Sequence, residues 1–153
     1  MTKLSAGILL YRGEGNAREV LLVHPGGPFW ANKDLGAWSI PKGEYTQDED
    51  PLAVAKREFA EELGSPPPDG DYLELGEIKQ PSRKLITAFA VAGDLDPATL
   101  QSNLFELEWP PKGGRKQSFP EIDRAKWFTL AEARTKIQPG QAPFIDRLLD
   151  LLG

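Results

Sequence analysis

Three glutamates, Glu58, Glu61 and Glu62, have the residue type and spacing that most clearly suggest chemistry. Positions i, i+3 and i+4 lie on one side of a helix, within an arc of about 100°. Carboxylates placed so close together repel one another, and a compact set of hard oxygen ligands is what Mg²⁺ or Mn²⁺ accepts. The glutamates are therefore a candidate metal site, and the alternative is an acidic helix face that water solvates.

The composition limits the other chemistries that are open to the chain. There is no cysteine, which excludes disulfides, thiolate zinc sites and a cysteine nucleophile. The one histidine, His24, excludes a multi-histidine metal site, and we expect it to be a structural hydrogen-bonding residue. The net charge of −5 argues against a general electrostatic grip on a nucleic-acid polymer. Acid/base catalysis, a carboxylate-bound metal, and serine or lysine nucleophiles remain.

The length and hydrophobicity are those of a globular domain. The chain has 153 residues, of which 40% are hydrophobic and 27% charged, so we expect one domain over residues 1–153. Its apolar runs are shorter than the roughly 20 residues that a membrane-spanning helix needs, and the N-terminus lacks a signal-peptide pattern. We therefore expect no membrane association and a cytoplasmic location.

Local signals predict that the helix carrying the glutamates runs from Pro51 to Leu63. Asp50 as the N-cap places Pro51 at the first helical position, whereas an earlier start would place this proline inside the helix at a cost of about 3 kcal/mol. Gly64 supplies the C-terminal stop. The apolar stripe of this helix recurs at spacings of three and four and consists of Leu52, Ala55, Phe59 and Leu63.

The remaining elements predict a mixed sheet. We expect a hairpin of two strands, a short strand that ends at a proline, and four further strands, at 4–11, 19–24, 38–41, 72–79, 84–92, 104–109 and 126–128. Thr129 and Glu132 form a capping box before a short helix, and Pro143 begins a last helix. Because strands and helices interleave without regular βαβ alternation, we expect helices on both faces of the sheet. Trp127 and Phe128 are expected in the core.

The segment from residue 43 to residue 65 resembles the signature box of the Nudix hydrolases. That box is Gly, five residues, Glu, seven residues, Arg-Glu, an apolar residue, one residue, Glu-Glu, one residue, Gly and a final apolar residue. Seven fixed positions match, namely Gly43, Glu49, Arg57, Glu58, Glu61, Glu62 and Gly64. Two positions depart from it: Phe59 is bulkier than the usual aliphatic residue, and Ser65 replaces the closing apolar residue. Neither departure touches the acidic positions.

The resemblance implies a fold, a reaction and a set of roles. The fold is an α/β/α sandwich with a mixed sheet and a loop-helix-loop motif, and the reaction is hydrolysis of a nucleoside diphosphate linked to another group X with Mg²⁺ or Mn²⁺. Glu58, Glu61 and Glu62 would ligate the metal, with the backbone carbonyl of Lys42 as a further ligand. An ion pair between Arg57 and Glu49 would fix the loop against the helix. Gly43 would permit a tight turn.

The general base is left open by the sequence. In some members of the family a glutamate of the box serves, and in others a glutamate from a loop near the end of the sheet. Glu121, in the predicted loop 118–123, is our first candidate for the base or an additional metal ligand. Glu44 or a glutamate of the box is the second candidate, and a plain surface role for Glu121 is the third reading.

Candidates for substrate binding come from the predicted loops. The run from Trp38 to Gly43 resembles the Trp-x-x-Pro-Lys-Gly entrance of the diadenosine polyphosphate and diphosphoinositol polyphosphate branches, which makes Trp38 and Lys42 candidates; the alternative for Lys42 is a solvated turn residue. Basic residues that either gather a polyphosphate tail or are plain surface residues are Lys112, Arg115 and Lys116. Aromatic residues that either pin loops to the core or stack a base are Phe29, Trp30, Tyr45 and Phe119.

The sequence thus favours a magnesium-dependent hydrolase whose substrate is a nucleotide, with a dinucleoside polyphosphate such as diadenosine tetraphosphate as the first choice. A nucleoside triphosphate pyrophosphatase and an ADP-ribose hydrolase are the alternatives within the enzyme class. A nucleotide-sensing module without catalysis is the alternative from another class. Either a monomer or a homodimer is compatible with the sequence.

Overall fold

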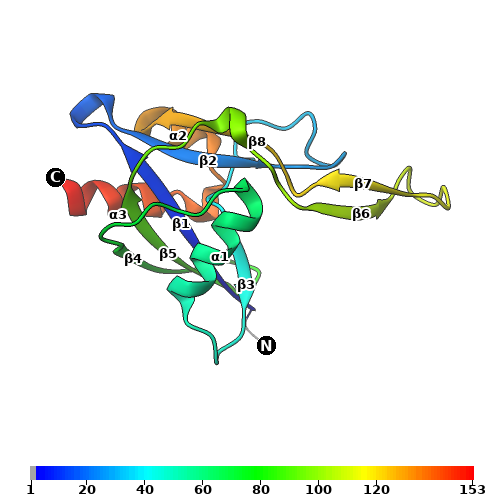
Figure 1. Ribbon diagram of the computed structural model, residues 1–153, viewed down its shortest axis with the longest axis horizontal. Helices are drawn as coiled ribbons and strands as arrows, with labels where there is room; N and C mark the ends of the chain where they lie inside the picture. Colours follow the sequence, from blue (N-terminus) through cyan, green and yellow to red (C-terminus); the bar gives the residue numbers. More distant parts are fainter. Residues whose placement is uncertain (1–2) are drawn as a thin grey trace.

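The computed structural model describes residues 3–153 and contains a six-stranded mixed sheet (Figure 1). The strand order is β4-β5-β1-β2-β8, with β3 also paired to β1. β1 and β5 are parallel and the other pairs are antiparallel. The strands are β1 (Lys3–Arg12), β2 (Glu19–Pro25), β3 (Lys42–Tyr45), β4 (Leu73–Lys79), β5 (Lys84–Ala92) and β8 (Ile122–Thr129).

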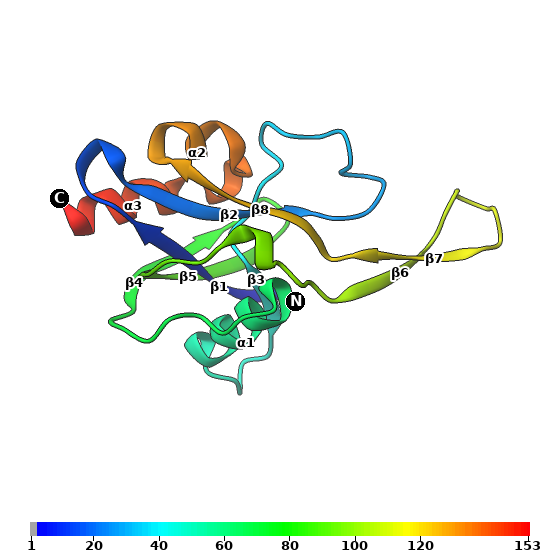
Figure 2. The ribbon, with the colours of Figure 1, turned by 45° about the horizontal axis from the view of Figure 1, so that its top comes forward.

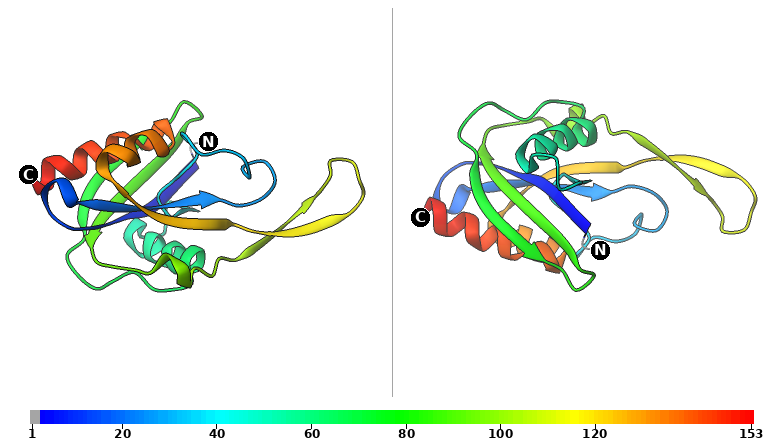
Figure 3. Two further views of the ribbon diagram at one scale, coloured as in Figure 1. Left: turned by 90° about the horizontal axis from the view of Figure 1, so that it is seen from above. Right: turned by 90° about the horizontal axis from the view of Figure 1, so that it is seen from below.

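Helices cover both faces of this sheet, as the sequence predicts. α1 (Pro51–Leu63) lies on one face, and α2 (Leu130–Lys136) and α3 (Pro143–Leu152) lie on the other (Figure 3). Successive side chains of β1 point to opposite faces of the sheet: Ile8 belongs to the core under α1, and Leu9 belongs to the core under α2 and α3. The fold is therefore an α/β/α sandwich. Three short 3₁₀ turns complete the described elements, at Gly15–Ala17, Pro97–Thr99 and Pro139–Gln141.

The bounds of α1 are those that its local signals predict. The side chain of Asp50 accepts a hydrogen bond from the Ala53 N–H at 3.1 Å, and Pro51 is the first helical residue. At the other end Gly64 has φ +77°, and its N–H donates to the Ala60 carbonyl at 2.8 Å. The capping box before α2 and the start of α3 at Pro143 are also confirmed.

A second, two-stranded sheet projects from the body as a long hairpin (Figures 1 and 2). It consists of β6 (Leu104–Glu108) and β7 (Lys116–Pro120). The prediction of a loop over residues 118–123 is therefore wrong, because Glu121 is the only residue between β7 and β8. The polar sequence of β7 carries no strand signal of its own, and its pairing with β6 makes it a strand.

The short strand predicted over residues 38–41 is also corrected. Trp38 and Ser39 form only isolated bridges, to Ile137 and Val23. The regular strand begins after Pro41, where β3 pairs with β1 from Lys42 onward. Pro41 has no N–H to donate to a ladder, so it separates the two segments. Trp127 and Phe128 are buried as predicted, and no helix within residues 3–153 is long and apolar enough to cross a membrane.

Candidate active site

The three glutamates of α1 lie in different environments. Glu62 is buried, Glu58 is half-buried and Glu61 is exposed, because the apolar stripe of α1 packs on the sheet and the glutamates border it to different degrees. Within residues 3–153 no three His, Asp or Glu side chains already surround one point as a metal site would require. The glutamates are thus neighbours on one helix rather than a closed ligand cage.

Gly43 allows the carboxylate of Glu58 to approach the backbone of β3. A Cβ atom added at Gly43 would lie 2.1 Å from Cδ and 2.4 Å from Cγ of Glu58. Gly43 also pairs with Ala6 in an extended strand, so the expectation of a tight turn at this glycine is wrong. The glycine is needed because only a residue without a side chain leaves room for this carboxylate.

Electrostatics make the buried carboxylates costly to ionise. Burial raises the pKa of Glu62 to about 8, against the opposing effect of the Lys42 N–H, which donates to Glu62 Oε1 at 3.2 Å. The charges of Glu58 and Glu121 raise the pKa of Glu62 further. Burial and the charge of Glu61 likewise raise the pKa of Glu58. Hard oxygen donors held close together at this cost fit a divalent cation, whose charge would favour the ionised forms.

A cavity of about 190 Å³ opens beside Glu62, and the structure brings Glu121 to it. Two backbone hydrogen bonds hold Glu121 there: its N–H donates to the Asn103 carbonyl at 2.7 Å, and its carbonyl accepts from the Gly26 N–H at 2.8 Å. The lining residues are Val23, Pro25, Ser39, Ile40, Lys42, Glu62, Glu121, Ile122 and Gln138. Glu121 reaches this place from the hairpin base rather than from the longer loop that the sequence suggests.

Arg57 connects the preceding loop to α1, as the resemblance implies. Its Nη1 lies 3.1 Å from Glu49 Oε2, and Glu49 Oε1 accepts the Thr46 N–H at 3.0 Å. Arg57 Nη2 also lies 3.7 Å from Glu58 Oε1. Arg57 is thus placed to hold the loop and to orient Glu58. Glu44 is exposed on β3 and faces Lys42.

Sequence reasoning missed Lys84, which lies against Lys42. Burial and the neighbouring ammonium of Lys84 lower the pKa of Lys42 to about 8. β3 and β5 both pair with β1, and this arrangement brings the two lysines together. No local pattern marks Lys84, since it is one lysine at the start of a strand. Gln138, which lines the cavity after α2, was missed for the same reason.

Several predicted substrate contacts lie elsewhere. Trp38 is only 2% exposed and belongs to the core under α2 and α3, with its indole N–H donating to Asp34 Oδ1 at 2.8 Å. Tyr45 is a residue of β3, not of a loop, and packs against the core under α1. Phe119 lies in β7, with its ring 6.0 Å from that of Phe105. None of these three side chains lines the cavity beside Glu62.

The basic residues predicted to gather phosphates are at the far end of the hairpin. Lys112 and Arg115 lie in the turn between β6 and β7, and Lys116 is the first residue of β7. The hairpin that these strands form projects away from α1 (Figures 2 and 3). The structure therefore does not bring them to the glutamates. Of the two loop aromatics, Trp30 packs against the core, whereas Phe29 is 59% exposed and contacts Trp109 edge-to-face at 5.4 Å.

His24 anchors the long loop after β2. It is fully buried, with Nδ1 2.8 Å from Asp123 Oδ1 and Nε2 2.7 Å from the Lys33 carbonyl. The structure thus gives His24 the structural role that the sequence predicts.

We expect His24→Ala to lower the free energy of unfolding by about 2–3 kcal/mol, since it opens a cavity and leaves buried polar groups unpaired. Hydrogen exchange of the amides in residues 26–36 should rise at the same time. Denaturant unfolding and exchange mass spectrometry measure the two effects. Unchanged exchange in the loop would contradict the anchoring role.

Comparisons with known proteins agree with the fold and with the motif. The model of the NUDIX domain family matches residues 1–148. The NUDIX domain of Shewanella oneidensis NrtR, solved with ADP ribose, has a TM-score of 0.68 at 17% identity and covers 100% of this chain and 90% of its own. A C. elegans Ap4A hydrolase binary complex has a TM-score of 0.67 at 19% identity and covers 97% of each chain. No curated protein sequence gives a significant match.

A third solved structure shows the same architecture in another setting. The C-terminal domain of mouse MUTYH, solved with human PCNA, has a TM-score of 0.64 at 18% identity and covers 99% of this chain and 90% of its own. At these identities the likeness is evidence for the fold.

The family model covers nearly the whole chain, so the chain belongs to the NUDIX family. The NUDIX family includes the Nudix hydrolases, which are pyrophosphohydrolases. Enzymes of this class generally use divalent metal ions.

Proposed function

We propose that the protein hydrolyses a pyrophosphate linkage in a nucleoside diphosphate linked to X, with a dinucleoside polyphosphate such as diadenosine tetraphosphate as the preferred substrate. The observation that carries the proposal is the cavity beside α1, where the buried Glu62 meets Glu121 and Lys42. An anionic substrate cannot approach these carboxylates alone, so the site requires cations.

The residues that would hold Mg²⁺ or Mn²⁺ are Glu58, Glu61 and Glu62, with the Lys42 carbonyl as a further ligand. Such an ion would neutralise phosphate charge and lower the pKa of water. The raised pKa values of Glu58 and Glu62 support this assignment, because a dication offsets the cost of keeping buried carboxylates ionised.

Three side chains, those of Lys42, Lys84 and Glu121, would act on substrate and water directly. Lys42 and Lys84 form a pair of ammonium groups on the strands that flank β1, and together they would hold phosphate oxygens. Glu121, at the rim of the cavity, would accept a proton from the attacking water. Glu44 is the alternative proton acceptor, since it faces Lys42 on β3.

Lys84→Met is expected to raise KM about tenfold and to leave kcat within about threefold. The variant removes one charge from the phosphate-holding pair without touching the glutamates. Steady-state kinetics with controlled free Mg²⁺ measure both constants. Lys79→Met, at the exposed end of β4, is the matched control and should behave as wild type. Equal KM values for the two variants would contradict the role of Lys84.

The substrate is tested by identifying products from several nucleotides in the presence of Mg²⁺. Diadenosine tetraphosphate yielding ATP and AMP supports the proposal. A nucleoside triphosphate yielding a monophosphate and pyrophosphate, as the best substrate, would replace it with a pyrophosphatase. Preferred cleavage of ADP-ribose would replace it with an ADP-ribose hydrolase, the ligand class seen in the NrtR domain. Nucleotide retained without turnover would indicate a sensing module.

A further inference from the structure

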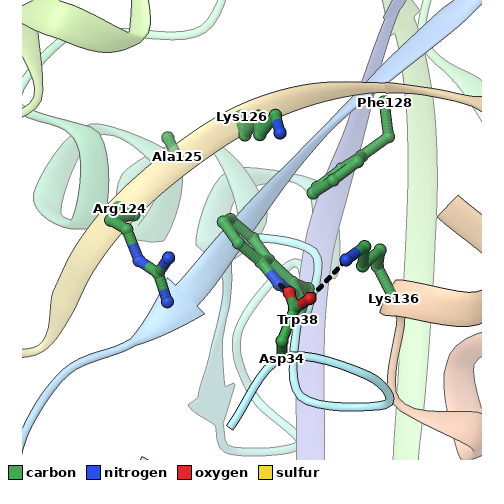
Figure 4. A pocket seen from close by; sticks show the side chains of 7 residues that line it. All are labelled: Asp34, Trp38, Arg124, Ala125, Lys126, Phe128 and Lys136. Atoms are coloured by element: carbon green, nitrogen blue, oxygen red, sulfur yellow. Dashed lines mark hydrogen bonds and ion pairs between the residues drawn. The ribbon is translucent and has the colours of Figure 1, made fainter. Parts of the chain in front are cut away.

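A second cavity, of about 290 Å³, lies on the face of the sheet opposite α1 (Figure 4). Trp38 lines it, whereas the next residue, Ser39, lines the cavity beside Glu62, so the two cavities share this segment but no lining residue. We call this second cavity the β8 cavity. Its lining residues are Asp34, Trp38, Arg124, Ala125, Lys126, Phe128 and Lys136.

The residues that line the β8 cavity carry more positive than negative charge, although the chain as a whole carries a charge of −5. Arg124 and Lys126 come from alternate positions of β8, and Lys136 comes from the last turn of α2. Asp34 is the one carboxylate among the lining residues, so the lining carries a net charge of +2. Two further carboxylates lie near but outside it: Asp123 and Glu132.

The contacts of Asp34 show how the β8 cavity binds a carboxylate. Its carboxylate accepts from the Trp38 indole N–H at 2.8 Å and pairs with Lys136 (Figure 4). The hydrogen bond from Lys136, together with that from Trp38, lowers the pKa of Asp34. Asp34 thus engages Lys136, whereas Arg124 and Lys126 face Asp123 and Glu132, which lie outside the lining.

Arg124 and Lys126 lie over aromatic rings that are themselves buried. The Arg124 guanidinium lies 5.2 Å from the centre of the Trp38 ring, and the Lys126 ammonium 5.3 Å from that of Phe128. Trp38 and Phe128 are 2% and 1% exposed, with their rings 5.0 Å apart edge-to-face. A nucleobase has no exposed ring on which to stack here. The cavity can therefore bind a ligand through charge but does not recognise a nucleobase. Within residues 3–153, the one ion pair of Arg124 joins its Nε to Asp123 Oδ1 at 3.5 Å.

We propose that the β8 cavity is a second anion site, which binds a phosphate dianion through Arg124 and Lys126 and is separate from the cavity beside Glu62. The ligand class is a terminal phosphate, either free as phosphate or pyrophosphate or carried by a nucleoside monophosphate. A dianion matches the net charge of +2 on the lining, and a guanidinium beside an ammonium suits phosphate oxygens. Binding at this site requires no metal ion.

The test is a titration followed by NMR in EDTA, where metal-dependent binding is absent. Inorganic phosphate, pyrophosphate and AMP are added separately, and the Trp38 indole N–H resonance is assigned with Trp38→Phe. We expect a saturable shift of this resonance. The double variant Arg124→Gln/Lys126→Gln should weaken binding about tenfold or more. The control Arg115→Gln/Lys116→Gln removes the same charge at the far end of the hairpin and should bind as wild type.

Three results would overturn the proposal. The first is a shift that does not saturate. The second is an equal loss of affinity in both double variants, which would indicate a general charge effect. The third is loss of the shift in Lys84→Met, which would place the anion at the lysine pair instead. If the Arg124/Lys126 double variant does not fold, Lys126→Gln alone replaces it, with Lys116→Gln as its control. Tighter binding of AMP than of the inorganic anions identifies the esterified source, and the reverse order identifies the free anion.

Discussion

Glu62→Gln is expected to reduce turnover at least about 1,000-fold while making the metal-free protein more stable at high pH. The loss follows because the amide removes one charge from the carboxylate set that would hold the divalent ion. Steady-state turnover at saturating substrate and controlled Mg²⁺ measures this effect. Residual turnover within tenfold of wild type would remove Glu62 from the metal site.

The stability effect of the same substitution has a defined sign. The pKa of Glu62 in the folded protein is about 8, above its ordinary value of 4.5, so the folded state binds more protons than the unfolded state between these values. The free energy of unfolding of the metal-free wild type should therefore fall as pH rises from 4.5 to 8. Glu62→Gln lacks this loss, and its advantage at pH 8.5 should be roughly 4–5 kcal/mol.

Urea unfolding in EDTA at pH 5 and pH 8.5 checks this expectation. Glu61→Gln is the matched control, because Glu61 is exposed on the same helix and its replacement leaves the buried carboxylate in place. We expect Glu61→Gln to lose metal affinity and most turnover while keeping the pH dependence of wild-type stability. The same fall in stability with pH in Glu62→Gln would show that another group causes it.

Gly43→Ala should have the second-largest effect. The added Cβ would lie 2.1 Å from Glu58 Cδ, so the carboxylate or strand β3 must move. We expect turnover to fall about 100-fold and the free energy of unfolding to fall by about 1–3 kcal/mol, as for other overpacked sites. Kinetics and denaturant unfolding measure the two losses.

The double variant Gly43→Ala/Glu58→Ala separates the two effects. Removal of the Glu58 side chain relieves the clash, so the double variant should regain most of the lost stability but no activity. Additive losses of stability would show that Gly43 matters for a reason other than Glu58.

Features that depend on neighbouring residues could be predicted from the sequence. The bounds of α1 follow from Asp50, Pro51 and Gly64, which act within one turn of the helix ends. The side shared by the glutamates follows from helical periodicity alone. In contrast, β7 is polar and becomes a strand through pairing with β6, and the strand at residues 42–45 depends on pairing with β1. Such long-range pairings leave little local signal.

The residues of the candidate site also fall into two groups: those that the sequence reveals and those that only the fold brings together. Glu58, Glu61 and Glu62 are adjacent in sequence and could be found there, whereas Lys84 joins Lys42 only because two distant strands flank β1. The sequence offers Arg115 and Lys116 as loop residues that gather a polyphosphate tail. The hairpin is instead an extended ladder, and it directs them away from α1 (Figure 3). The sequence shows no sign of the close approach between Gly43 and Glu58.

The single residue between β7 and β8 has a consequence for how this protein tolerates change in length. Side chains alternate between the two faces of a strand, so one inserted residue at position 121 would reverse the direction of the carboxylate. Insertions at the turn of residues 110–115 would lengthen the arm and leave that parity unchanged. Natural variants should therefore accumulate insertions and deletions in the hairpin turn of residues 110–115 and avoid them at position 121.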